Sequence, residues 1–354
     1  MAGSGKTESI VTRCVEDPRR RLIVTYTEHG QRELENRLRK ALADGLISEA
    51  PEVIGWYSFL IENFLKPYLP IYLPGQNYRG FNFDYSPGKY AKGDRRYFDH
   101  EGRAGRQTLG YIARMINEQA TGWPIARLEK IYEEIVFDEV QDLAASDLVI
   151  IENLLKSSIR VYMVGDPRQI VYETTTSDTK YRKYRGVEKV TWYREREARS
   201  LLEIEEQCIN YRSNQEIVDL ANQVFNPALS LADAISGQTD TVSHRGIFRI
   251  TEADVADYCM QFNPLPLRWN KSSAKKFENF LNPLNFGDVK GLQADHVLIF
   301  PTTAITKFVC ERQPIEKPIS AAKLYVAITR ARHSVAFVLP PNVVTSDMQQ
   351  WTVS

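Results

Sequence analysis

Residues 3–7, with the sequence GSGKT, have the residue types and spacing of a phosphate-binding loop. They match the end of the pattern G-x-x-x-x-G-K-[ST], in which backbone N–H groups and a lysine surround phosphate oxygens while a hydroxyl ligates Mg²⁺. The first glycine of that pattern, and the strand that normally leads into the loop, would precede Met1. Alone, this short match is compatible with a working nucleotide site, a damaged one or a chance occurrence.

A second segment, IVFDEVQD at residues 135–142, strengthens the nucleotide interpretation. It is an apolar run that ends in two adjacent acids, of which Asp138 would hold Mg²⁺ and Glu139 would orient and deprotonate an attacking water. A lone acid pair after a strand is usually part of a solvated loop. The apolar run before this pair and the Gln-Asp after it make a chance occurrence much rarer.

Further segments carry side chains that could reach phosphate. YMVGDPRQIVY at residues 162–172 places Gln169 after a buried strand, where its amide could hydrogen-bond a γ-phosphate, although a simple strand-to-turn is the alternative. Three more segments have a cation at the edge of a strand or the start of a helix: Arg212 in NYRS (210–213), Lys290 in DVKGLQADHVLIF (288–300) and Arg330 in KLYVAITRARHSVAF (323–337). Such a cation can hydrogen-bond phosphate across a cleft.

The elements that must position these residues are predicted to be buried parallel strands that alternate with helices. Strands buried on both faces are near-continuous apolar runs, and such runs occur at residues 21–26, 133–139, 159–166, 296–301 and 334–339. Helical spacing is found at residues 29–46 and 214–225, and a charged helical stretch at 193–208 would join two lobes. This alternation predicts an α/β fold. Residues 65–90, rich in Pro, Gly and aromatics, are predicted to be an inserted element.

Length and composition limit the class of protein. A chain of 354 residues suggests two domains, and 43% hydrophobic with 25% charged residues is typical of a globular protein with a sizeable core. Basic and acidic residues number 45 each, so a nucleic-acid surface would have to be a local patch. The four cysteines lie too far apart for a zinc site or a disulfide framework, which favours a reducing cytoplasm. We expect no membrane span and no signal peptide.

Taken in order, these motifs resemble those of superfamily 1 helicases of the UvrD/Rep/PcrA type. The matching stretches are AGSGKT, VTYTEHGQRELENRL, GWYSF, VFDEVQD, VGDPRQIVY, NYRS, VKGLQADHVLIF and YVAITRAR, from residue 2 to about residue 338. DEVQD, NYRS and VAITRA together are highly specific. The resemblance implies two RecA-like lobes, at residues 1–205 with an insert at about 65–128 and at residues 206–354. The first lobe would lack the strand before its phosphate loop, and the large helical insertions 1B and 2B would be small or absent.

The resemblance implies an ATP-dependent enzyme that translocates on single-stranded or tailed DNA. Lys6 would contact the β- and γ-phosphates, Thr7 and Asp138 would ligate Mg²⁺, and Glu139 would act on the attacking water. The other predicted nucleotide contacts in the first lobe are Gly3, Ser4 and Gly5.

The resemblance implies that the second lobe completes the nucleotide site. Tyr211 would stack on adenine, Gln293 would contact the ribose, and Arg212 and Arg330 would reach the γ-phosphate as arginine fingers. Gln169 would couple the γ-phosphate to the DNA site. Closure of two lobes on one ATP, followed by opening, would move single-stranded DNA across both.

The predicted DNA track combines aromatic platforms and polar or cationic contacts, which suit sequence-independent binding. Its members are Thr27, Trp56, Ser58, Phe59, Tyr172, Tyr184, Arg185 and Lys290. Tyr184-Arg185-Gly186 would correspond to the aromatic-Arg-Gly of the family, displaced by the insertion ETTTSDTKYRK.

Residues 77–106 combine seven cations and four acids with interleaved aromatic residues. The cations are Arg79, Lys89, Lys92, Arg95, Arg96, Arg103 and Arg106, and the aromatic residues are Tyr78, Phe81, Phe83, Tyr85, Tyr90, Tyr97 and Phe98. A DNA-contacting insert, a surface loop and a docking site for another protein are the alternatives.

The sequence departs from the family pattern in several places. Gln293 replaces a glutamate and Gly287 replaces a histidine. The loop at residues 3–7 has no strand before it in this chain, and a loop that must order on binding pays about 1–2 kcal/mol for each residue fixed. We therefore expect weak or absent ATP hydrolysis by this chain alone, unless a partner or upstream residues supply the strand.

A compact helicase core of this kind resembles the small helicase-like subunits that accompany OLD-type nucleases in bacterial anti-phage systems, notably Gabija. FGDVKGLQADHVLIFPTT, with Gly287 in place of histidine, favours the same comparison. Two functions are therefore open. The first is a DNA translocase or helicase that works with a nuclease partner in phage defence or DNA processing. The second is a weak or inactive regulatory subunit that senses nucleotide or DNA and controls such a partner. A nuclease activity of the chain itself has little support.

Overall fold

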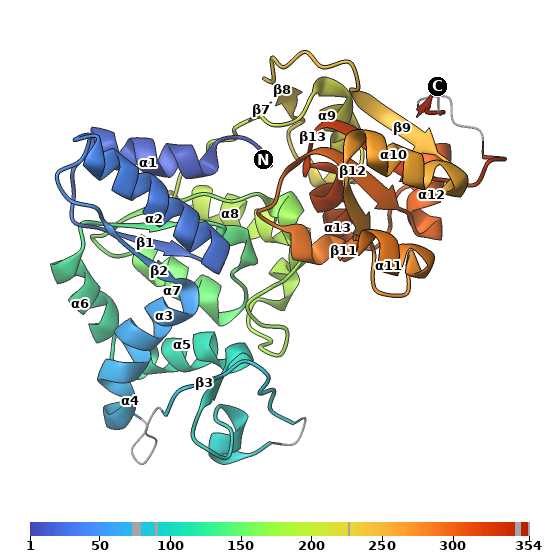
Figure 1. The fold of residues 1–354 in the computed structure, drawn as a ribbon. Helices are drawn as coiled ribbons and strands as arrows, with labels where there is room; N and C mark the ends of the chain where they lie inside the picture. The colour runs from blue at the N-terminus through green and yellow to red at the C-terminus, as the bar shows by residue number, and fades with distance from the viewer. Residues whose placement is uncertain (73–78, 89–90, 226, 344–347, 353–354) are drawn as a thin grey trace. The chain divides into compact units, whose positions relative to one another are not determined.

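The computed structural model describes residues 1–72, 79–88, 91–225, 227–343 and 348–352 (Figure 1). The chain contacts divide into two compact units. We call Lys6–Asp166 with Tyr172–Ile204 the first unit, and Met1–Gly5, Pro167–Val171 and Glu205–Ser354 the second unit. The main division thus falls after Ile204, next to the predicted boundary after residue 205, and two short segments that the sequence placed in the first lobe have their contacts in the second unit.

A parallel sheet forms the centre of the first unit. Over the described residues its strands are, in spatial order, β2 (Glu52–Gly55), β1 (Arg21–Thr25), β5 (Glu134–Phe137) and β6 (Arg160–Met163). Side chains of a strand alternate between the two faces of its sheet. Ile23 accordingly packs on one face and Leu22 with Val24 on the other, which explains why the run RLIVT is buried throughout.

Helices cover both faces of this sheet (Figure 1). One face carries α1 (Lys6–Glu16) and α2 (Glu28–Ala43). The other face packs against α3 (Trp56–Leu60), a π-helical turn (Ile61–Leu65), α4 (Lys66–Tyr72), α5 (Leu109–Gln119), α6 (Trp123–Ile131), α7 (Ser146–Leu155) and α8 (Lys189–Glu197). Between α4 and α5, the short strands β3 (Phe81–Asn82) and β4 (Ala104–Gly105) pair with each other and not with the central sheet.

The second unit contains a larger parallel sheet. Its described strands are, in order, β11 (Leu284–Asn285), β10 (Leu265–Arg268), β12 (Ala294–Phe300), β13 (Ala331–Val338), β9 (Gly246–Ile250) and β14 (Gln349–Gln350). The helices are α9 (Gln215–Asn222), α10 (Val255–Phe262), α11 (Glu278–Leu281), α12 (Thr303–Glu311) and α13 (Pro318–Ile328). A separate pair joins β7 (Ile209–Asn210) to β8 (Ile235–Ser236).

The predicted α/β fold with parallel sheets is confirmed, and each predicted apolar run overlaps a strand: β1, β5, β6, β12 and β13. One prediction is wrong. The helix expected over residues 193–208 ends at Glu197, because Ser200 adopts a left-handed conformation and the N–H of Leu201 bonds back to the carbonyl of Arg196. Among the described residues, no helix is both long enough and apolar enough to span a bilayer.

Asp147 of α7 is a buried carboxyl in the first unit, 2% exposed. It lies so close to α5 that a Cβ at Gly110 would come within 2.0 Å of its Oδ1. Burial raises the pKa of Asp147 to about 7, and Asp178 acts in the same direction, while a hydrogen bond with Thr174 acts against it. The folded state therefore keeps a proton that the unfolded state releases near pH 4. The stability that this protonated carboxyl contributes is lost as the pH rises from about 4 to about 7.

We predict that Asp147→Asn stabilises the first unit at pH 8, because the amide resembles the protonated acid and needs no proton. Hydrogen-exchange mass spectrometry on peptides from α5 and α7 measures this stability unit by unit. Between pH 5 and pH 8 the variant should lose less protection than the wild type, whereas Asp44→Asn, at an exposed carboxyl, should follow the wild type. An unchanged pH dependence in Asp147→Asn would contradict the assignment.

Candidate functional site

The direction of α1 places Lys6 and Thr7 at the carboxyl edge of the first sheet. Glu134, at the start of β5, accepts a hydrogen bond from Arg13 Nε at 2.9 Å. It also forms an ion pair with Arg21. The last turn of α1 therefore lies beside the amino ends of β1 and β5. Because α1 runs antiparallel to these strands (Figure 1), its first turn lies at their carboxyl ends. A helix start at this edge is a favourable place for a phosphate.

The same edge carries Asp138 and Glu139, directly after β5. Asp138 is 8% exposed and accepts a hydrogen bond from the N–H of Glu139 at 3.0 Å. A Cβ at Gly30 would lie 3.7 Å from Asp138 Oδ2 and 2.9 Å from Thr25 Oγ1. The Thr25 hydroxyl is buried and has no hydrogen-bond partner among the described residues. A carboxylate beside an unsatisfied hydroxyl fits a bound phosphate with Mg²⁺, which prefers oxygen ligands.

Gln141 holds the side chain of Glu139 in place. Its Nε2 donates to Glu139 Oε2, and its Oε1 accepts from the N–H of Asp166, after β6, at 3.0 Å. A Cβ at Gly165 would lie 2.5 Å from that Oε1, so the glycine permits the contact. Glu139 itself has φ of +56°, an uncommon conformation for a non-glycine residue. The motif DEVQD contained this glutamine, but the sequence alone did not predict its role.

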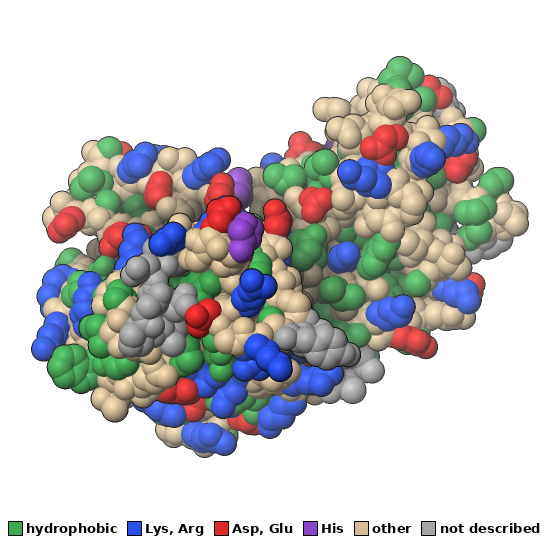
Figure 2. Space-filling model, turned by 90° about the horizontal axis from the view of Figure 1, so that it is seen from below, with side chains coloured by type: hydrophobic (Ala, Val, Ile, Leu, Met, Phe, Trp, Pro, Cys, Tyr) green, Lys and Arg blue, Asp and Glu red, His purple; other side chains and the backbone are tan. Residues whose placement is uncertain are grey.

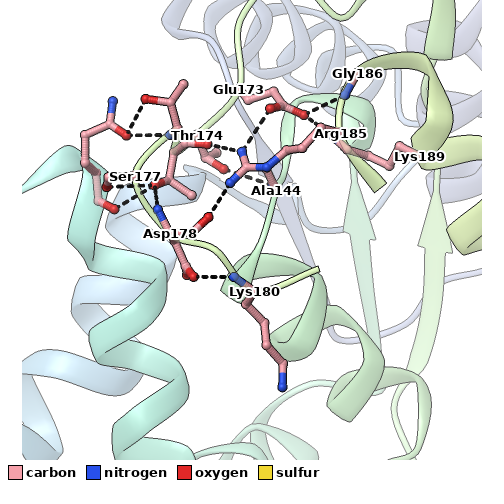
Figure 3. Close-up of polar contacts among 12 residues, drawn as sticks. Ala144, Glu173, Thr174, Ser177, Asp178, Lys180, Arg185, Gly186 and Lys189 are labelled. Atoms are coloured by element: carbon pink, nitrogen blue, oxygen red, sulfur yellow. Dashed lines mark hydrogen bonds and ion pairs between the residues drawn. The ribbon is translucent and has the colours of Figure 1, made fainter. Parts of the chain in front are cut away.

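A buried lysine continues this network behind the strand ends. Lys189 of α8 is 0% exposed, and its Nζ lies 2.5 Å from the carbonyl oxygen of Gln141 and 3.2 Å from Glu173. Burial lowers the pKa of Lys189, although Glu173 acts against this shift. Burial would raise the pKa of Glu173, but Lys189 and Arg185 hold it below its ordinary value. Figure 3 shows Glu173 between Arg185, Lys189 and the N–H of Gly186.

The predicted insertion after Tyr172 is an ordered loop that is bonded to the segment after β5. Thr174 Oγ1 accepts from the N–H of Ala144 at 3.0 Å, and Asp178 Oδ1 accepts from the N–H of Lys180 (Figure 3). The loop lines a solvent-open pocket of about 410 Å³. Its lining residues are Glu173, Thr176, Asp178, Thr179, Arg182 and Arg185.

Two predicted DNA contacts in this loop need correction. Arg185 donates to Glu173 at 2.9 Å and to the carbonyls of Thr175 and Asp178, so its guanidinium maintains the loop. Tyr184 is 4% exposed and packs in the core, where no base can reach its ring. Arg182, in contrast, is exposed at the pocket.

The prediction that Trp56 and Phe59 of the GWYSF segment stack on DNA bases is also wrong. They are 1% and 0% exposed, stack on each other with centroids 5.4 Å apart, and both meet the edge of Phe137. Ser58 between them is exposed. Thr27 is half-buried and caps α2, since its hydroxyl accepts from the N–H of Gly30 at 3.1 Å.

Tyr172, at the start of the loop, is 51% exposed, and its DNA contact stays a prediction.

The second unit brings together three of the predicted catalytic residues. Arg330 Nη2 lies 3.4 Å from Gln169 Oε1, although 161 residues separate them in sequence. Arg330 also donates to the carbonyls of Val326 at 3.1 Å and Leu292 at 3.0 Å. Arg212 donates to the carbonyl of Thr329 at 3.1 Å. Arg212 and Arg330 thus flank the end of α13.

Residues 3–5 also belong to the second unit. The carbonyl of Gly3 accepts from the N–H of Tyr211 at 2.9 Å, and the ring of Tyr211 is 61% exposed. Gly3 has φ of +69°, and a Cβ there would lie 2.6 Å from Asn210 Oδ1, so this close approach requires glycine. Ser4 is buried and donates to the carbonyl of Met1.

For three further residues, the structure gives exposure or backbone conformation but does not test the predicted contact. Gly5 has φ of +78° and is exposed, as is Gln293, whereas Lys290 is half-buried. Their nucleotide and DNA contacts stay predictions.

Sequence comparison bears on the segment that contains these motifs. Residues 108–182 match the UvrD/REP helicase N-terminal domain. This range includes Asp138, Glu139, Gln141 and Gln169, which supports the prediction of a superfamily 1 helicase. The RecBCD enzyme subunit RecB of Borreliella burgdorferi (strain ATCC 35210 / DSM 4680 / CIP 102532 / B31) is 28% identical over 95 residues, which are 27% of this chain and 7% of that protein.

Two similar solved structures are those of the Arterivirus nonstructural protein 10 (helicase) and of its complex with DNA. They are 14% identical to this chain, with TM-scores of 0.49 and 0.48. Each comparison covers 96% of this chain, which spans 58% and 59% of those chains.

We predict that Glu173→Gln destabilises the first unit by about 3 kcal/mol, because it leaves the buried Lys189 without its charged partner. Replacing Lys189 as well, in Glu173→Gln/Lys189→Met, should recover a large part of that loss. Urea unfolding followed by hydrogen exchange in α8 measures both variants. A double variant no more stable than the single one would show that the two side chains are not coupled.

Proposed function

We propose that this protein is an ATP-dependent single-stranded DNA translocase or DNA helicase of the UvrD type. The observation that carries the proposal is the carboxyl edge of the first sheet. There, the first turn of α1, with Lys6 and Thr7, shares an edge with Asp138 and with a Glu139 that Gln141 orients. The match of residues 108–182 to a helicase domain supports the same function.

The proposed chemistry assigns a role to each of these side chains. Lys6 donates to the phosphate oxygens of ATP, and Glu139 accepts the proton of the water that attacks the γ-phosphate. Mg²⁺ held by Thr7 and Asp138 would neutralise phosphate charge. Gln141 acts as a positioning residue, since it fixes the carboxylate of Glu139 against the end of β6.

The second unit contributes the remaining groups in this proposal. Tyr211 stacks on adenine, Arg212 and Arg330 stabilise the charge that develops on the γ-phosphate, and Gln169 reports its presence to the DNA site. The DNA contacts that remain from the prediction are Thr27, Ser58, Tyr172 and Lys290, to which we add Arg182. The proposal also includes that the protein works with an OLD-type nuclease in phage defence and that it does so in the cytoplasm.

The second candidate function is a regulatory subunit without effective hydrolysis. The division of residues 3–7 between the two units favours it, because Gly3, Ser4 and Gly5 belong to the second unit while Lys6 and Thr7 begin the first. Binding of nucleotide without turnover would distinguish this function from the enzyme.

We predict that Glu139→Gln lowers the rate of DNA-stimulated ATP hydrolysis about 10²-fold or more, as expected for loss of a general base. Binding of a fluorescent ATP analogue should change little, since the amide keeps the hydrogen bond to Gln141. The matched control is Glu133→Gln, an exposed glutamate at the opposite end of β5, which should hydrolyse ATP like the wild type. Full activity in Glu139→Gln, or no turnover by the wild type with single-stranded DNA, would contradict the enzyme.

We predict that Arg330→Lys slows hydrolysis much more than it weakens ATP binding, because lysine keeps the charge but not the planar group. Steady-state kinetics and analogue binding measure the two effects separately. Arg332→Lys, at a neighbouring and more exposed arginine, is the control. Equal losses of rate and affinity in Arg330→Lys would rule out a contact made in the transition state.

A further inference from the structure

The inserted segment between α4 and α5 has a hydrogen-bonded centre of its own. The carboxylate of Asp99 accepts from Asn82 Nδ2 at 2.7 Å, from the N–H of Glu101 and the N–H of Arg103 at 2.9 Å each, and from Arg103 Nε at 2.8 Å. Burial opposes ionisation, but these donors hold the pKa of Asp99 far below its usual range. Together with the pairing of β3 and β4, this centre gives residues 79–88 and 91–106, which we call the insert, a defined conformation. Tyr78, Lys89 and Tyr90 lie outside the described residues.

A row of aromatic rings connects the end of β1 to the surface of the insert. Tyr26 meets Tyr57 edge-on at 6.0 Å, Tyr57 packs on Phe81 at 5.6 Å, and Phe81 meets Phe83 edge-on at 4.3 Å. Tyr26, Tyr57 and Phe81 pack against the core, whereas Phe83 is 61% exposed. The last ring is therefore held in a fixed orientation with much of its surface in solvent. The row begins next to Thr27 and passes next to Ser58, two of the predicted DNA contacts.

The insert also carries exposed cations. Arg79, Lys92, Arg95 and Arg96 are exposed, and none of them forms an ion pair with another described residue. Arg103, in contrast, is paired with Asp99 and Glu101.

A hydrogen bond joins the segment that carries Phe83 to the segment that carries Arg95 and Arg96. Tyr85, two residues beyond Phe83, donates its hydroxyl hydrogen to the carbonyl of Arg95. The Tyr85 ring lies so close to Gly105 of β4 that a Cβ there would come within 2.7 Å of it. Figure 2 shows Lys and Arg side chains gathered over part of the first unit on the face turned to the viewer.

We infer that the insert is a binding surface for single-stranded nucleic acid, with a base stacked on Phe83 and phosphates on the exposed cations. A fixed, exposed aromatic ring and unpaired cations on one insert are the combination that binds single strands without sequence preference. Because the whole chain has no net charge, attraction of a polyanion has to come from a local surface of this kind. The inference rests on the proposed function, and it adds a contact surface that the family motifs do not contain.

The test is fluorescence anisotropy with a labelled oligothymidylate of about 16 nucleotides, without ATP. Phe83→Ala should weaken binding about tenfold to hundredfold, as expected for the loss of one base stack. Phe83→Trp should restore it. Phe280→Ala removes a phenylalanine of the second unit that is equally exposed, at 61%, and should bind like the wild type. Unfolding curves check that Phe83→Ala remains folded.

The salt dependence tests the cations separately. Arg95→Ala/Arg96→Ala should reduce the slope of log affinity against log salt by about 1.4, because each phosphate contact to a single strand contributes about 0.7. An unchanged slope, or Phe83→Ala binding like the wild type, would overturn the inference. A Phe83-dependent affinity for duplex DNA equal to that for the single strand would overturn it as well. Binding of polyglutamate in place of the oligonucleotide would also overturn it and would indicate a protein partner.

The outcome is independent of the ATPase measurement. Phe83-dependent binding by a chain that does not hydrolyse ATP would support the insert surface and contradict the enzyme. Hydrolysis that Glu139→Gln abolishes, in a chain whose oligonucleotide binding ignores Phe83, would do the reverse.

Discussion

The candidate site depends on the ion pairs that the buried carboxylate of Glu134 forms with two arginines. This carboxylate is 0% exposed and is shared by Arg13 of α1 and Arg21 of β1. Removing one partner of such a buried ion pair typically costs about 3–5 kcal/mol. The pairing fixes the end of α1 at the amino ends of the strands, so that Lys6 and Thr7 lie at the edge where Asp138 and Glu139 follow β5. A helix packed in the opposite direction would separate the lysine from the acids by the length of the sheet.

A chain of buried polar contacts extends from that edge into the loop after Tyr172. Glu139 contacts Gln141, the carbonyl of Gln141 contacts Lys189, and Lys189 pairs with Glu173, which also pairs with Arg185. In the low dielectric of the interior each of these groups needs its partner. The candidate catalytic carboxylate and the polar pocket of the loop are thus parts of one hydrogen-bonded structure, which would allow a change at one to affect the other.

The aromatic residues show how far a sequence pattern can predict which rings bind nucleic acid. Trp56, Phe59 and Tyr184 have the residue types of a base-stacking surface, and all three are in the core. Phe83 lies in a segment for which the sequence left three alternatives open, and it is the exposed ring at the end of the row. A large apolar ring stabilises a core and a nucleic-acid interface by the same burial from water, so residue type does not distinguish the two locations.

The sequence by itself determined the α/β class, the positions of β1, β5, β6, β12 and β13, and the residues that follow them, because strands buried on both faces require continuous apolar runs. Only the tertiary structure decided which of the neighbouring polar groups meet. Arg330 and Gln169 are 161 residues apart, and Lys189 reaches a carbonyl 48 residues earlier. Exposure and pairing at this range depend on how complete elements pack together, and a local pattern of residue types carries no information about that packing.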